Sequence, residues 1–136
     1  MKTFKFTITT PEKTLVSEEV EQVSLPTEMG EITILPHHIP LVSLLKSGEM
    51  RIVKSGKEEL YAVAGGFIEV LGNHVTVLAD SAEHADEIDE ARAEEARKRA
   101  EEVMAKEVES ERMFAAQLKL EKHLARLRVV RKRRKK

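Results

Sequence analysis

The distribution of glycine and proline divides this chain into two parts that must fold differently. All six glycines and all four prolines lie at or before Gly72, and the remaining 64 residues contain neither. Because these residues are the strongest interrupters of regular structure, the second part can form long helices, whereas the first requires many turns. The pattern predicts a turn-rich domain over residues 1–84 and a helical one over residues 85–136.

Short stretches of alternating polar and apolar residues fill the first part. Phe4, Phe6 and Ile8 alternate with polar residues, the period-two pattern of a strand with one solvated face. Gly56 and Gly72 lie in short polar breaks, as expected of hairpin turns. Many short strands indicate a sandwich or small barrel. Its core must be mainly Val, Ile and Leu, because tryptophan is absent and phenylalanine is rare. The expected strands cover residues 4–9, 14–17, 20–25, 31–35, 50–54, 58–64, 67–71 and 74–78.

The second part consists mostly of strong helix formers. Asp86 is the predicted N-cap of a first helix, and a turn near Val108–Glu111 would join it to a second one. This turn has no Gly, Pro or Asn to specify it, and the apolar stripes are thin. We therefore expect the folded hairpin and an extended form to be close in free energy. The two stripes are Ile88, Ala96, Ala100, Val103 and Met104, and Met113, Ala116, Leu120, Leu124, Leu127 and Val130.

The charge distribution is uneven along the chain. The formal net charge is −1, but the last eleven residues contain eight cations and no acid. Such a block is typical of an interaction tail for a nucleic acid, an anionic lipid surface or an acidic protein surface. The tail has no aromatic residues, so base stacking is not expected.

The sequence contains no recognisable catalytic motif. There is no phosphate loop, nucleophile elbow or paired zinc histidine motif, and the absence of cysteine excludes thiol chemistry and disulfides. His37 and His38 are adjacent and would point in opposite directions on an extended chain, so they make a poor metal pair. No apolar run is long enough for a signal peptide or a membrane span. These features predict a soluble, cytoplasmic, non-catalytic protein.

Two further features have both a structural and a functional interpretation. The loop from Gly30 to Leu41 carries two prolines and several apolar residues, so it is either a rigid cap on the core or a docking surface. In the helical part, Asp89 and Arg92 are neighbours at i,i+3, and Lys122 and Arg126 at i,i+4. Such charges either form solvated ion pairs or, if a hairpin brings them together, a nucleotide site.

In combination, five motifs resemble the epsilon subunit of bacterial rotary F-type ATP synthases, over nearly the whole chain. Each motif alone is weak, but all five occur in the expected order before a helical C-terminus. They are Thr10-Pro11, Leu35-Pro36-x-His38-x-Pro40-Leu41, Gly65-Gly66-Phe67-Ile68-Glu69-Val70, Asn73-x-Val75-Thr76-Val77-Leu78 and Ile88-Asp89-x-x-Arg92-Ala93.

The resemblance implies an α+β architecture: an N-terminal antiparallel β-sandwich of about ten strands and a C-terminal two-helix hairpin. It implies a non-catalytic central-stalk subunit of a proton-translocating enzyme, peripheral at the cytoplasmic face of the cell membrane and without direct membrane insertion. The expected partners are the gamma subunit, the ring of c subunits and the alpha/beta catalytic head, with no nucleic acid. The hairpin would inhibit ATP hydrolysis when it extends. The alternative is a stand-alone nucleic-acid-binding protein that uses its basic tail.

The resemblance also implies three sets of site residues. ATP would be a regulatory ligand of the folded hairpin, with or without Mg2+, and there would be no catalytic cofactor and no metal site of the protein's own. Lys122 stands where an arginine is common in the family. A lysine keeps the positive charge but cannot make the bidentate contact of a guanidinium. The ATP site would comprise Glu83, Ile88, Asp89, Arg92, Ala93, Arg99, Lys122 and Arg126. The partner contacts would be Glu31, His38, Leu41 and Val42. The inhibitory tail, directed at an acidic region of the beta subunit, would use Arg126, Arg128, Arg131, Lys132, Arg133 and Arg134.

Overall fold

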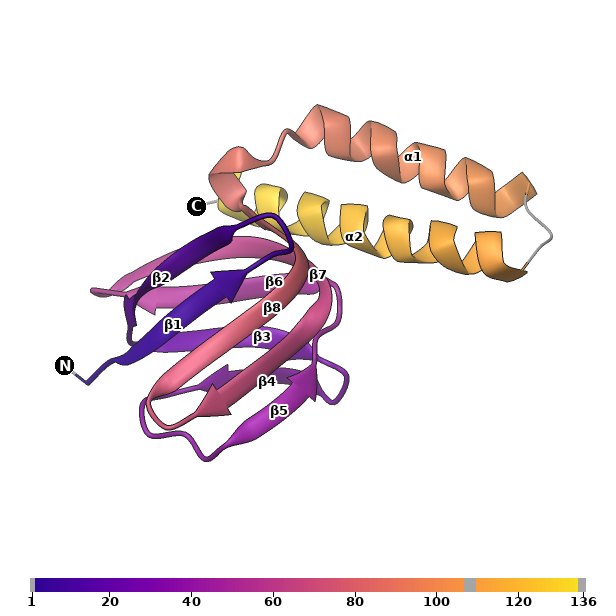
Figure 1. The fold of residues 1–136 in the computed structure, drawn as a ribbon. Helices are drawn as coiled ribbons and strands as arrows, with labels where there is room; N and C mark the ends of the chain where they lie inside the picture. The colour runs from indigo at the N-terminus through magenta and orange to yellow at the C-terminus, as the bar shows by residue number, and fades with distance from the viewer. Residues whose placement is uncertain (1, 107–109, 135–136) are drawn as a thin grey trace.

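A computed structural model describes residues 2–106 and 110–134 of the chain. It contains a β-sandwich followed by two helices, as predicted (Figure 1). The strands are β1 (Phe4–Thr9), β2 (Thr14–Val20), β3 (Gln22–Thr27), β4 (Gly30–Ile34), β5 (Leu41–Leu44), β6 (Gly48–Lys54), β7 (Lys57–Leu71) and β8 (His74–His84). The short 3-10 helix η1 (Ala85–Glu87) leads into α1 (Glu90–Lys106), and α2 is Ser110–Arg134.

The strands form one bent sheet in the order β2-β1-β8-β7-β6-β3-β4, with β5 added to β7. In the described part of the chain the pairs are antiparallel except for β1 and β8, which run parallel from Lys5 opposite His74 to Thr9 opposite Leu78. The expectation of an antiparallel sandwich was therefore wrong at this one pair of the described strands. The parallel pairing depends on residues far apart in the sequence, because β1 lies between β2 and β8, the last strand of the sandwich.

The long strand β7 accounts for part of the difference between the eight strands of the described sheet and the roughly ten that the resemblance implied. The expected strands 58–64 and 67–71 are one continuous strand that passes through Gly65 and Gly66. Both glycines have positive φ, 66° and 107°, and a Cβ on Gly66 would lie 2.0 Å from the Leu78 carbonyl oxygen. The glycines therefore redirect the strand without ending it, so that its first half pairs with β6 and its second half with β5.

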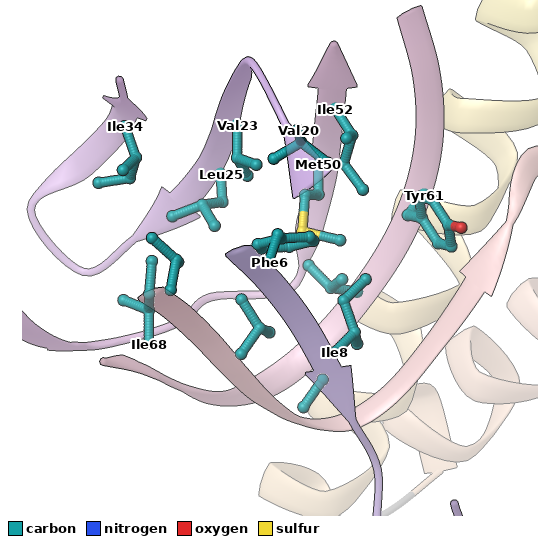
Figure 2. Close-up of a cluster of buried hydrophobic side chains, with 14 of the residues drawn as sticks. Phe6, Ile8, Val20, Val23, Leu25, Ile34, Met50, Ile52, Tyr61 and Ile68 are labelled. Carbon is teal, nitrogen blue, oxygen red and sulfur yellow. The ribbon is translucent and has the colours of Figure 1, made fainter. Parts of the chain in front are cut away.

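A continuous aliphatic core fills the sandwich. The alternation in β1 buries Phe4, Phe6 and Ile8 completely or nearly so, as predicted. Figure 2 shows Phe6 beside Met50, surrounded by aliphatic side chains from the other strands. The remaining members of the cluster are Val20, Val23, Leu25, Ile34, Leu45, Ile52, Tyr61, Val63, Ile68, Val70, Val75, Val77 and Ala79.

The two helices form an antiparallel hairpin, and the C-terminal half of α2 lies between α1 and strands β6 and β7 (Figure 1). Of the predicted turn, Val108 lies outside the described residues and Glu111 already belongs to α2. The predicted stripes are correct at Ala100, Ala116, Leu127 and Val130, which are buried.

Two stripe predictions were wrong. Val103 is 47% exposed and Leu124 is 38% exposed, although both were expected to pack between the helices. Near its C-terminus α2 also faces the sheet, so Ala125 and Val129 are buried there in addition to the interhelical stripe. Toward the connection the hairpin projects beyond the sandwich, where α1 is the one described element that packs beside α2 (Figure 1).

The start of α1 also differs from the prediction. Asp89, and not Asp86, caps this helix: its carboxylate accepts a hydrogen bond from the Arg92 amide at 3.1 Å, and its carbonyl accepts one from the Ala93 amide. Asp86 instead lies in η1, where its amide donates to the His84 ring at 3.0 Å. Either aspartate could cap a helix by its chemistry. Ile88 is buried in the second apolar cluster and has an extended backbone between η1 and α1, so α1 begins after it.

Candidate ligand site and partner surfaces

Arg126 lies at the junction between the sandwich and the hairpin. Its Nε is 2.8 Å from Oε1 of Glu83, which belongs to the last residues of β8. In the described part of the chain, however, this buried Nε has no hydrogen bond of acceptable geometry, so the contact is an ion pair with a misdirected donor. One Nη lies 3.0 Å from Nδ1 of His123, one turn earlier on the same helix. Since a guanidinium can only donate, the His123 ring accepts at Nδ1 and is neutral.

A group of cations surrounds His123. Burial lowers the pKa of this imidazole below its ordinary value, and nearby positive charges lower it further. The contributing side chains come from both helices: Arg126, Lys122, Arg99 and Lys119. An environment that disfavours one more proton also favours an anion, so the chemistry of this region suits a phosphate or carboxylate.

A cleft of about 710 Å³ opens beside this group, between α1 and α2. Arg99, Lys119 and His123 line it together with small apolar residues of both helices. It therefore offers an apolar wall for a flat ring system and cations for an anionic group. The apolar lining is Ala96, Ala100, Val103, Ala115 and Ala116, and Arg112 lies at the same cleft.

The residues of the Ile88-Asp89-x-x-Arg92-Ala93 motif serve the start of α1. Ile88 and Ala93 are buried in a second apolar cluster with Leu127 and its neighbours on α2. Asp89 caps the helix, and its carboxylate lies 3.9 Å from Nε of Arg92. The Arg92 side chain is 84% exposed, so its guanidinium projects into solvent.

The predicted ATP residues thus fall into two groups. The structure brings together Glu83, Arg99, Lys122 and Arg126 around His123, whereas Asp89 and Arg92 form a separate pair and Ile88 and Ala93 are packing residues. His123, which belongs to the first group, was not predicted from the sequence. A signal was present, because a residue three positions before Arg126 shares its helix face.

The predicted partner residues occupy different environments. Val42 is exposed on β5, but Leu41 packs against the sandwich core. Glu31 is paired with Arg51, with Oε1 and Nη2 2.6 Å apart, and Nδ1 of His38 lies 2.7 Å from the Ile39 carbonyl oxygen.

Exposed apolar residues that were not predicted form a row across three neighbouring strands, Leu44, Phe67 and Leu78. Val42 lies two residues before Leu44 on the same face of β5, and Leu35 and Ile39 are exposed in the loop before this strand.

Most of the predicted tail cations are paired with acids of the same chain. Arg126, Arg131, Lys132 and Arg133 all form ion pairs with other elements. Arg128 is exposed and has no ion pair within the described residues, and the Arg134 side chain lies outside them.

The described residues form neither a metal cluster nor a membrane-spanning helix. Among the described residues, no group of three or more His, Asp or Glu side chains is placed to hold a metal ion. No helix in residues 2–106 or 110–134 is both long and apolar enough to cross a bilayer.

Two protein-family models match consecutive parts of the chain. The model for the ATP synthase delta/epsilon chain, beta-sandwich domain, matches residues 3–85, and the model for its long alpha-helix domain matches residues 86–131. The class of protein is therefore the delta/epsilon chain of ATP synthases.

Full-length relatives identify the member of that class. The chain is 48% identical over 127 residues to the ATP synthase epsilon chain of Herpetosiphon aurantiacus, covering 93% of each protein. It is 44% identical over 131 residues to that of Bacillus licheniformis, covering 96% of this chain and 100% of the relative. A structure of the Euglena gracilis mitochondrial ATP synthase contains a chain of the same fold, with a TM-score of 0.79 at 23% identity, covering 90% of this chain and 78% of that one. The chain belongs to the ATP synthase epsilon chain family, whose members are non-catalytic subunits of that enzyme.

Proposed function

We propose that this chain is a central-stalk subunit of a proton-translocating F-type ATP synthase and that its helical hairpin senses ATP and restrains hydrolysis. The observation that supports sensing is the group of cations around His123, which includes Arg126 with its misdirected buried Nε. The stalk assignment is supported by family membership, and it favours this role over a stand-alone nucleic-acid-binding protein. As such a subunit the chain would be a peripheral component held at the membrane by its partners.

In the stalk, the exposed apolar surface of the sandwich would dock on the gamma subunit and the ring of c subunits. The row Leu44, Phe67 and Leu78 supports this, because exposed apolar residues on adjacent strands form a continuous patch. The preceding loop, with Ile39 exposed, would extend the contact toward the ring. A matched pair of variants, Phe67→Asp in the row and Thr7→Asp on β1, tests the surface by co-purification with gamma. Loss of gamma with Phe67→Asp alone supports this surface, and retention of gamma contradicts it.

ATP would bind to the folded hairpin beside His123. The phosphates would lie between Arg126, Lys122 and Arg99, and the Arg126 fork would turn from Glu83 toward them. Lys122 supplies a point charge without a fork, so phosphate contacts depend most on Arg126. A ligand that binds only the folded hairpin stabilises it by about 2.7 kcal/mol at a hundredfold excess over Kd. A stabilisation of this size is enough to shift a balance between folded and extended forms.

Isothermal titration calorimetry with ATP, in the presence and absence of Mg2+, tests the sensor. We expect saturable one-to-one binding to the full chain and loss of binding in Arg126→Ala. Lys98→Ala is the matched control, because Lys98 is exposed on α1 and lies outside the group. No binding up to millimolar ATP would reject the sensor and leave the stalk role standing.

Restraint of hydrolysis would require the hairpin to open and the basic segment of α2 to reach an acidic region of the catalytic beta subunit. Removing residues 126–136 should therefore raise ATP hydrolysis by the assembled catalytic head. Equal hydrolysis with the full and the shortened chain, both present in the complex at the same ratio, would contradict this role.

A further inference from the structure

We propose that Glu49, Asp86, Glu90 and Glu94 form an internal acidic surface that holds Arg131, Lys132 and Arg133 at the end of α2 and competes with an acidic partner for the same side chains. The part that concerns hydrolysis rests on the proposed function, whereas the internal contact does not. The acids come from β6, η1 and α1, so closing this contact joins the sandwich to both helices.

The contact between β6 and α2 is the least exposed. Lys132 Nζ lies 2.9 and 3.1 Å from the two carboxylate oxygens of Glu49. The Glu49 side chain is only 13% exposed and also approaches Arg51 Nε at 3.5 Å. The Glu49 carboxylate is largely buried, and Arg51 Nε is farther from it than Lys132 Nζ is, so detaching Lys132 costs more than breaking one fully exposed surface pair.

Arg131 joins the two helices. Its Nε lies 3.1 Å from a carboxylate oxygen of Glu90, and its Nη2 lies 3.0 Å from one of Glu94. These acids are four residues apart and share a face of α1. One guanidinium therefore spans one turn of α1, and Arg131 also lowers the pKa of the Glu94 carboxyl, together with the larger effect of Arg97.

Arg133 completes the contact at the domain junction, where its Nη2 lies 2.6 Å from Asp86 Oδ1. Residues 131, 132 and 133 are consecutive, and successive side chains of a helix point about 100° apart. They therefore reach α1, β6 and η1 respectively, and the end of α2 is surrounded by acids on three sides. A helix carrying these cations cannot bind an acidic partner until this surface has released them.

The pairs are individually weak and sensitive to salt, because exposed ion pairs contribute little and are screened at moderate ionic strength. Buried Leu127, Val129 and Val130 supply the apolar part of the same contact. The acidic surface therefore adjusts the balance between folded and open hairpin, and an acidic partner can shift this balance toward the open form by offering replacement carboxylates.

Distance measurements on the full chain test the internal contact. Spin labels at Glu12→Cys and Gln117→Cys report the separation of α2 from the sandwich, because the chain has no cysteine of its own and both positions are exposed. We expect Glu49→Gln to raise the open population about threefold, and the double variant Glu49→Gln/Glu94→Gln about tenfold. The two increases multiply because the free-energy contributions of independent ion pairs add. Raising the salt concentration should have the same effect on the unsubstituted chain and a smaller one on the double variant.

Two controls make the test specific. Glu31→Gln also removes a carboxylate partner of Arg51 but removes no ion-pair partner of Lys132, so the open population should stay unchanged. Glu49→Lys should open the hairpin strongly, and adding Lys132→Glu should close it again through the reversed pair. If Glu49→Gln behaves like Glu31→Gln, or if the reversed pair fails to close the hairpin, the internal contact is overturned.

The catalytic head then tests the competition. With the variant subunit assembled, Glu49→Gln should inhibit hydrolysis more strongly than the unsubstituted subunit, whereas Glu95→Gln, on the solvent face of α1, should not. If the distances change as expected while hydrolysis does not, the internal contact stands and the proposed inhibitory role fails. If neither changes, the internal acidic surface itself is rejected.

Discussion

The sandwich and the hairpin of this chain are stabilised by different interactions. In the sandwich, fully buried side chains such as Phe6, Ile52 and Ile68 form one continuous core. The hairpin has a smaller second apolar cluster, which it shares with β7, together with ion pairs that are mostly exposed to solvent. Because apolar burial is little affected by salt or pH and exposed ion pairs are sensitive to both, the sandwich is suited to a permanent scaffold and the hairpin to a conditional one.

The largest effect is expected when a phenylalanine is truncated to alanine in each region and the two losses of stability are compared. Phe6→Ala should destabilise the protein by about 4 kcal/mol, because Phe6 is completely buried in the sandwich core. Phe114→Ala should change stability by less than about 0.5 kcal/mol, because Phe114 is 62% exposed on α2. Urea unfolding followed by circular dichroism measures both. Similar losses for the two variants would contradict the difference between the regions.

A smaller and more local effect is expected from Leu127→Ala. Leu127 is buried where α2 meets α1 and the sheet, and its truncation should cost about 2–3 kcal/mol. The loss should appear in hydrogen exchange as faster exchange of α1 and α2 amides, with β1 and β3 still protected. Leu118→Ala, at an exposed position of α2, is the matched control. Equal loss of protection in the sheet would show that the two regions unfold together.

The hairpin should also loosen in mild acid. The pKa of His123 is lowered in the folded hairpin by burial and by neighbouring cations, so the open form takes up a proton first. The stabilisation associated with the neutral ring is present above the ordinary pKa of 6.5 and is lost as the pH falls through the lowered value. The open population in the spin-label experiment should therefore rise between pH 7.5 and 5.5, and His123→Gln should reduce this rise. An unchanged profile in His123→Gln would assign the pH dependence to other groups.

The smallest effect at neutral pH is expected from Tyr61, the only tyrosine in the chain. Burial raises its pKa to about 12, and nearby glutamates contribute. Its ring lies edge-on to His84, with centroids 4.9 Å apart, so it reports on the junction of the two regions. The stabilisation from the neutral phenol should be complete below pH 10 and lost as the pH rises through about 12. Tyrosinate absorbance measures this, and ionisation of the native chain near pH 10, as in urea, would contradict burial of the ring.

Local pattern was sufficient for much of the fold. The alternation of β1 and the turns at Gly56 and Gly72 needed only neighbouring residues, and each was confirmed. Strand β5 was missed, because four residues after Pro40 have no clear period and their partners on β7 lie far along the chain. The parallel pairing of β1 with β8 could not be predicted either, because the pairing of distant strands leaves no pattern in the local sequence.

The candidate site shows the same limit. The resemblance supplied Arg99, and residue types and helical spacing identified Lys122 and Arg126; the structure places all three near His123. The same reasoning expected Arg92 to converge with them, yet this side chain projects into solvent. Helical spacing relates residues on one helix, but the relative rotation of two helices depends on how the pair packs against the sheet.

By itself, the sequence determined that a turn-rich β domain precedes a helical hairpin, and that the chain ends in a cationic segment. These properties follow from composition and local periodicity, which act within a few residues. Only the tertiary structure decided that Arg131, Lys132 and Arg133 face acids on three separate elements. Those pairs join residues up to 83 positions apart. The sequence around a charged residue therefore does not predict which distant residue will lie beside it in the folded chain.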